Sequence, residues 1–248
     1  MSTSINPSTP FLASDTQARQ AHASGRKVIG YVANNVPVEL ILAAGMVPFE
    51  ATGDPHGSTE RGDLYMEDFH DGHVRSLFSR ALSGDFDFFD LLIIPRSSEG
   101  YLQLYYYLLE AKKWEPELRL PELYLFDLLQ TPFWITGRYV KSQVAALRDK
   151  LGEVAGKPID DDAVWAGINT ANATRRRLAE VNALRRNDPA RLPGSDMLRI
   201  IRAGGFLPRA EYDDALDALL AQHGDADGVA PRPRVLVKGS PQDSTDFY

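Results

Sequence analysis

Three short polar turns, each following an apolar run, hold the residues best placed for chemistry. The first turn is residues 33–35 with Asn34 and Asn35, the second is residues 95–100, and the third follows Phe126. If the three runs are parallel strands, their carboxyl ends meet at one edge of the sheet, where open α/β folds bind ligands. The sequence therefore predicts a single binding edge built from these turns.

Residues 68–73 offer nitrogen and oxygen atoms that a divalent metal could use. His70 and His73 are three residues apart and would share a face if this segment is helical. Asp71 lies between them, and Asp71 with His73 forms the candidate pair of ligands. An exposed helix surface with two ordinary histidines is the simpler interpretation.

The second turn contains Ser97, Ser98 and Glu99, two hydroxyls beside a carboxylate. No G-x-S-x-G sequence surrounds them, so a hydrolase triad is not indicated. The glycines form neither G-x-G-x-x-G nor G-x-x-x-x-G-K-[ST], so both common nucleotide-binding fingerprints are absent. Glu39 falls in the first turn of an expected helix, where the helix dipole stabilises a carboxylate whatever its role.

Residues 28–53 form the element that positions the first turn. A buried strand, the turn, a helix opened by Pro37, a stop at Gly45 and a second strand over 46–51 make a βαβ unit. The alternation continues with a helix over 65–82, a strand over 88–94, a helix over 101–113 and a strand over 123–126. This order predicts an α/β fold with a parallel sheet.

The chain as a whole divides by composition into five parts. We expect a disordered arm at residues 1–25, a sheet domain over 26–130, a helical block packed on it over 131–223, a linker at 224–233, and the start of a truncated second α/β domain over 234–248. The 4-3-4 spacing of Val140, Val144, Leu147 and Leu151 gives one helix of the block an apolar face.

Composition and charge exclude several classes of function. The formal net charge of −7 argues against a general nucleic-acid binder. No apolar run approaches about 18 residues, so we expect no membrane span, and residues 1–25 lack the pattern of a leader peptide. We therefore expect a cytoplasmic protein. Without cysteine there is no disulfide, thiol nucleophile or thiolate-held metal.

Taken together, these segments resemble the 2-hydroxyacyl-CoA dehydratase and benzoyl-CoA reductase family. The match covers roughly residues 26–248 and depends on the order and spacing of several motifs rather than on any single one. The motifs run from Gly30 through Pro37 into Glu39, Leu40, residues 43–45 and Pro48, and continue at 74–76, 90–95, 98–99, 156–159, 172–176 and 234–240.

The resemblance implies a Rossmann-like (flavodoxin-like) sheet and a role as one subunit, similar to the D component, of a two-subunit enzyme. Family members dehydrate 2-hydroxyacyl-CoA to enoyl-CoA as lyases, or reduce benzoyl-CoA as oxidoreductases, by radical chemistry that depends on a 4Fe–4S cluster. The implied partners are a homologous cluster-bearing subunit, an ATP-dependent activator and an acyl-CoA ligand.

The positions that match the family's cluster cysteines are Ala33, Asp71 and Ser98. Alanine cannot ligate iron, and aspartate and serine are hard oxygen donors poorly matched to an iron–sulfur core. We therefore expect no cofactor on this chain, and an accessory or degenerate subunit that is inactive by itself. Five further positions are candidates for the substrate site: Asn34, Asn35, Glu39, Arg75 and Glu99.

Two other functions remain open. One is a non-enzymatic interaction or scaffold subunit, in which uncovered apolar and aromatic surface serves as a dimer face. The other is a metal enzyme with oxygen ligands, using Asp71 and His73 or Ser98 and Glu99.

Overall fold

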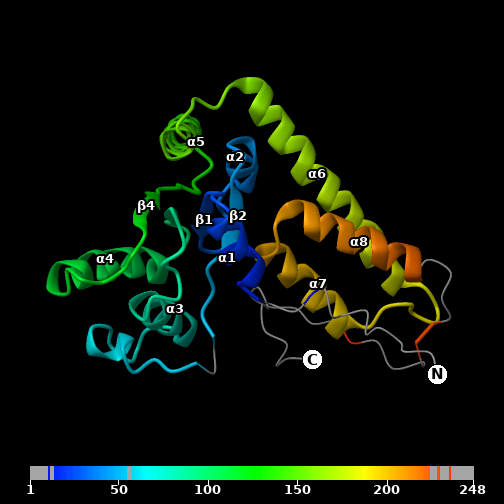
Figure 1. Cartoon of the computed structure of the whole chain (residues 1–248), viewed down its shortest axis with the longest axis horizontal. Coiled ribbons are helices and arrows are strands. Elements are labelled where there is room, and N and C mark those ends of the chain that lie inside the picture. Colours follow the sequence, from blue (N-terminus) through cyan, green and yellow to red (C-terminus); the bar gives the residue numbers. More distant parts are fainter. Residues whose placement is uncertain (1–10, 12–13, 55–56, 224–227, 230–234, 236–248) are drawn as a thin grey trace. The chain divides into compact units, whose positions relative to one another are not determined.

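The computed structural model describes residues 11, 14–54, 57–223, 228, 229 and 235. The strands among them form one parallel sheet in the order β2-β1-β3-β4 (Figure 1). They are β1 Val28–Tyr31, β2 Val47–Glu50, β3 Leu91–Pro95 and β4 Glu122–Phe126. The expected α/β fold with a parallel sheet is confirmed. The strand expected at 234–240 lies outside the described residues apart from Val235.

The first βαβ unit follows its sequence pattern closely. Every residue of β1 is buried, as expected for a strand covered on both faces. α2 Val38–Ala43 begins after Pro37, and the chain then turns at Gly45, whose φ of +76° costs glycine no strain. β2 returns parallel to β1, with Val28 opposite Val47.

Helices cover both faces of the sheet. α2 and α5 Trp134–Ala155 share one apolar core with the strands, to which Ile29, Ile93 and Leu147 contribute. α3 Gly72–Leu82 and α4 Glu99–Trp114 pack against each other, and in Figure 1 they lie on the other side of the strands from α2 and α5.

The strand order creates a topological switch point. The crossover through α2 places β2 on one side of β1, and the crossover through α3 places β3 on the other side. The connections that leave β1 and β3 therefore run in opposite directions from the same edge. Sheets of this order bind their ligands there.

The prediction of a helix over 65–82 is wrong for residues 65–71, which are not part of α3. α3 begins only at Gly72, because the side chain of Asp71 caps it. Ahead of it lie a 3₁₀ turn, Gly62–Leu64, and an irregular segment that buries Met66. The chain thus reaches the carboxyl edge of the sheet in a turn rather than in a helix.

Within the arm expected to be disordered at residues 1–25, the structure describes a helix, α1 Thr16–Ala23. Ala18 is fully buried. The Arg19 guanidinium donates to the carbonyl of Asp85 at 2.7 Å, so a charged side chain of this polar segment is tied to another part of the chain.

The described residues group into two compact units. The first is residues 19–168, with the sheet, α2–α5 and the start of α6. The second contains the rest of α6 Asp161–Ala183, a 3₁₀ turn at Leu184–Arg186, α7 Gly194–Phe206 and α8 Arg209–His223. The domain boundaries expected at 131 and 223 stay a prediction, and most of the expected linker at 224–233 lies outside the described residues.

The second unit has an apolar core of its own around Tyr212. The Tyr212 hydroxyl donates to the carbonyl of Ile200 at 2.8 Å, and burial raises the pKa of Tyr212. Across the described ranges, no helix combines the length and the apolar character needed to cross a membrane.

Candidate functional site

The carboxyl ends of the strands bring the predicted turns to one edge of the sheet. Hydrogen bonding between neighbouring segments continues just past the strands. The Val32 N–H donates to the Ile93 carbonyl at 3.0 Å, and the Arg96 N–H donates to the Phe126 carbonyl at 2.9 Å. The turns therefore leave the sheet side by side, at the spacing of adjacent strands, about 4.8 Å.

Ala33 has a backbone conformation that is uncommon for a residue with a side chain. Its φ is +58°, in the left-handed region. There the Cβ atom crowds the next carbonyl oxygen, at a cost of about 1 to 2 kcal/mol. Asn34 and Asn35 follow it and are exposed. Backbone outliers of this kind cluster at ligand sites, and this one lies beside the switch point.

The first turn of α3 lies against the segment that follows β2. Asp71 Oδ1 accepts a hydrogen bond from the His73 N–H at 2.9 Å and so caps the helix. The Gly53 N–H approaches His73 Nε2 at 3.5 Å, and a Cβ on Gly53 would overlap the His73 carbonyl oxygen. His70 lies outside α3, so it does not share a helical face with His73 as the sequence analysis supposed.

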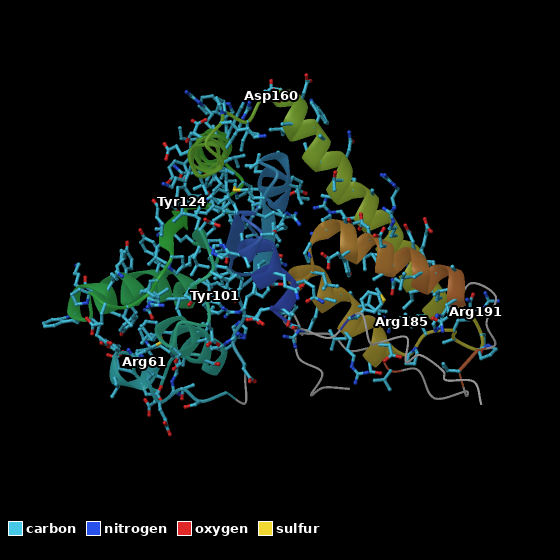
Figure 2. The ribbon with its side chains drawn as sticks, in the orientation of Figure 1. Arg61, Tyr101, Tyr124, Asp160, Arg185 and Arg191 are labelled. Carbon is cyan, nitrogen blue, oxygen red and sulfur yellow. The ribbon has the colours of Figure 1, made fainter. Side chains whose placement is uncertain are left out.

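The first turn of α4 lies against the first turn of α3. Ser98 Oγ accepts a hydrogen bond from the Tyr101 N–H at 3.3 Å, and Figure 2 shows Tyr101 at the sheet end of α4. Glu99 follows and is exposed. A Cβ on Gly100 would lie 3.3 Å from Val74 Cγ2, so the two helices begin in contact.

The structure thus places Asp71 and His73 in the neighbourhood of Ser98, although residues 68–73 were not among the turns predicted for this edge. Arg75 does not join them. Its guanidinium donates to Asp63 Oδ1 at 3.0 Å from Nε and at 2.7 Å from Nη2. This hydrogen bond, with a smaller one from Thr59, holds the pKa of Asp63 below its usual value.

Glu39 lies in the first turn of α2, directly after the turn that holds Ala33, and is half-buried. α6 covers the backbone of this helical turn, because a Cβ on Gly167 would overlap the Glu39 carbonyl oxygen. α6 therefore supports the start of α2 within the first unit.

A further polar cluster at the edge was missed by the sequence analysis. Asp127 follows β4, pairs with Arg96 Nη1 at 3.4 Å and accepts a hydrogen bond from the Tyr139 hydroxyl at 2.6 Å. That hydrogen bond raises the pKa of Tyr139. The available signal was the position of Asp127 immediately after a predicted strand. The cluster joins the turns after β3 and β4 to α5.

The donors at the three cysteine-matched positions do not suit an iron–sulfur cluster. Ala33 offers no donor atom, and the oxygens of Asp71 and Ser98 already accept backbone hydrogen bonds. Clusters in proteins are held chiefly by cysteine thiolates. Across the part of the chain that the structure describes, no three histidine, aspartate or glutamate side chains gather as a metal site.

A parallel sheet with a switch point, a strained turn and two adjoining helix starts defines an α/β protein of the class whose members bind ligands at the carboxyl edge of the sheet. Comparison with known protein families identifies the family to which the chain belongs. Residues 34–248 match the family described as 2-hydroxyglutaryl-CoA dehydratase, D-component, and the chain belongs to this family. The resemblance predicted from the sequence is confirmed.

The similar curated proteins are subunits of two kinds of enzyme. The chain is 31% identical to a benzoyl-CoA reductase subunit from Thauera aromatica, over 91% of this chain and 58% of the relative. It is 25% identical to the beta subunit of (R)-2-hydroxyglutaryl-CoA dehydratase from Acidaminococcus fermentans, over 82% of this chain and 53% of the relative. The chain therefore spans somewhat more than half the length of these relatives.

Proposed function

We propose that this chain is an accessory subunit of an enzyme complex that dehydrates or reduces an acyl-CoA thioester, and that it holds no iron–sulfur cluster itself. The observation that carries the proposal is the family match without any cysteine. The cysteine-matched oxygens of Asp71 and Ser98 support it, because they serve as helix caps. The relatives are named as subunits, which supports a partner.

Because this chain lacks the thiolate donors that a cluster needs, the cluster and the electron transfer are assigned to other subunits of the complex. A homologous subunit with cysteines would hold the cluster, and an ATP-dependent activator would supply the electron. This chain would contribute surface and ligand contacts at the carboxyl edge of its sheet. The exposed amides of Asn34 and Asn35 can donate and accept hydrogen bonds there. The N-terminal ends of α3 and α4 meet at the same edge of the sheet, and their dipoles favour the anionic groups of a CoA thioester.

Anaerobic reconstitution with ferrous iron and sulfide tests the absence of a cluster. The wild-type chain should show no stoichiometric cluster by iron analysis, absorption or EPR spectroscopy. A triple variant, Ala33→Cys with Asp71→Cys and Ser98→Cys, should gain cluster absorption, because it restores thiolates at the matched positions. A stoichiometric 4Fe–4S signal on the wild-type chain would contradict the proposal.

Calorimetric titration with benzoyl-CoA tests ligand binding separately. Binding that weakens when Asn34 and Asn35 are both replaced by alanine supports an acyl-CoA contact at the edge. The matched control is Gln20→Ala, an exposed amide in α1, the helix that leads into the amino end of β1 at the opposite edge of the sheet. No binding by the wild-type chain would favour the alternative of a non-enzymatic interaction subunit.

A further inference from the structure

The start of α5 exposes three large apolar side chains in succession. Phe133 is 66% exposed, Trp134 is 74% exposed and Ile135 is 63% exposed. Side chains of this size leave about 400 Å² of apolar surface in contact with water. Single exposed apolar residues are ordinary, but three large ones in succession are unusual at a surface in contact with water and favour an interaction surface here. We call these three residues the α5 patch.

The charges on the exposed face of α5 run in a definite order. Arg138 and Lys141 lie near its start, and Asp149 and Glu153 lie near its end. The Arg138 guanidinium lies over the Trp134 ring, 5.0 Å from its centroid. Glu153 Oε2 already pairs with Lys150 Nζ at 3.4 Å, whereas Lys141 and Asp149 form no ion pair among the described residues.

This order is complementary to itself when the helix is reversed. A two-fold axis near Ala145 would place Lys141 of one copy opposite Asp149 of the other, because both residues are four positions from the axis. The same axis brings Arg138 close to Glu153 of the other copy. Ala145 is exposed and has a small side chain, which permits the close approach of two helices at the axis.

We propose that α5 is the interface between two copies of this chain, packed antiparallel about a two-fold axis near Ala145. Trp134 of each copy then meets the other copy at Gly156 and Lys157, eleven and twelve residues beyond the axis. Both are exposed, and a Cβ on Gly156 would meet nothing within 4 Å, which leaves a flat surface for the indole ring. The Lys157 ammonium can lie over that ring.

The area is adequate for a dimer. Trp134 lies on the face of α5 that meets the second copy, so two copies supply on the order of 400 Å² of indole surface toward the roughly 1,600 Å² that a stable interface buries in total. The exposed face of α5 from its start to Asp149, about 16 residues and so about 24 Å long, supplies the remainder from each copy. A second copy in the reversed direction would cover the exposed Trp134 and would place opposite charges beside each other. A second copy of this chain is therefore the partner that this surface fits.

Sedimentation velocity across a concentration series tests the proposal. The wild-type chain should be a dimer at micromolar concentration, and Trp134→Ser should raise the dimer dissociation constant at least about tenfold, because the aromatic contact at each end of the interface is lost. Trp114→Ser is the matched control. Trp114 is also exposed, at 77%, but lies at the end of α4, and its loss should leave the constant unchanged.

Charge exchange tests the reversed alignment. Lys141→Glu and Asp149→Lys should each weaken the dimer at low salt, and the double variant should restore it, because the opposed pair is re-formed with its signs exchanged. A wild-type chain that is still monomeric at about 100 µM would overturn the proposal. A monomer that pairs only with a homologous subunit would overturn it as well. A dimer that is insensitive to Trp134→Ser would overturn it too, and failure of the double variant would overturn the antiparallel alignment.

Discussion

At the scale of single residues, two oxygens that could bind a ligand are already used by the backbone. Asp71 accepts from the His73 N–H, and Ser98 accepts from the Tyr101 N–H. Each bond satisfies one of the N–H groups that the start of a helix leaves unpaired. Aspartate and serine are among the side chains that cap helices best. The residues at these two positions therefore fix where α3 and α4 begin, a role that needs no metal.

Replacing Asp71 with alanine should lower the free energy of unfolding by about 1 kcal/mol, because the His73 N–H loses its acceptor. Asp71→Asn should retain most of the stability, since asparagine caps a helix about as well as aspartate. Urea unfolding followed by circular dichroism measures both variants. Equal losses in the two variants would mean that the charge, not the cap, is what stabilises α3.

At the scale of elements, the strands and the first βαβ unit could be predicted because their signals are local. The start of α3 could not, because the apolar pattern continues through residues that are packed but not helical. Met66 is 2% exposed, and the Tyr65 ring packs edge-to-face against Phe78 while its hydroxyl donates to Glu115. The apolar residues of this irregular segment are buried by tertiary packing, and their spacing in the sequence resembles the spacing of apolar residues in a helix.

Part of the candidate site could likewise be predicted from local sequence signals, and part of it could not. The turns at its edge could be predicted because each directly follows an apolar run. The Arg96–Asp127–Tyr139 cluster could not be derived, since Arg96 and Asp127 are 31 residues apart and Asp127 and Tyr139 are 12 apart. Nothing in the local pattern indicated that Arg75 would be engaged by Asp63 rather than directed to the edge.

The contact between the segment after β2 and α3 has no room for a side chain at Gly53. Gly53→Ala should lower the free energy of unfolding by about 2 kcal/mol, because the new Cβ would overlap the His73 carbonyl and displace the first turn of α3. Gly72→Ala, at the first residue of α3, is the control, because a Cβ there meets nothing within 4 Å. It should be neutral or slightly stabilising. Equal stability of the two variants in urea unfolding would contradict the close contact.

At the scale of the whole chain, each of the two units has buried apolar side chains of its own. Ile93 and Leu147 belong to the core of residues 19–168, and Val181 and Leu216 belong to the core of the other unit. Among the described helices, α1 and α6 alone contribute residues to both units. The side chains of each core pack mainly against one another. We therefore expect each unit to unfold locally with its own free energy of opening.

Leu216→Ala tests this separation by hydrogen exchange. Leu216 is fully buried in α8, and its truncation should cost about 2 to 5 kcal/mol locally. Amides of α7 and α8 should then exchange at least about tenfold faster, while those of β1 and β3 keep their wild-type rates. Ile201→Ala, at a position in α7 that is 51% exposed, is the control and should change little. Equal acceleration in β1 and β3 would show that the two cores open as one cooperative unit.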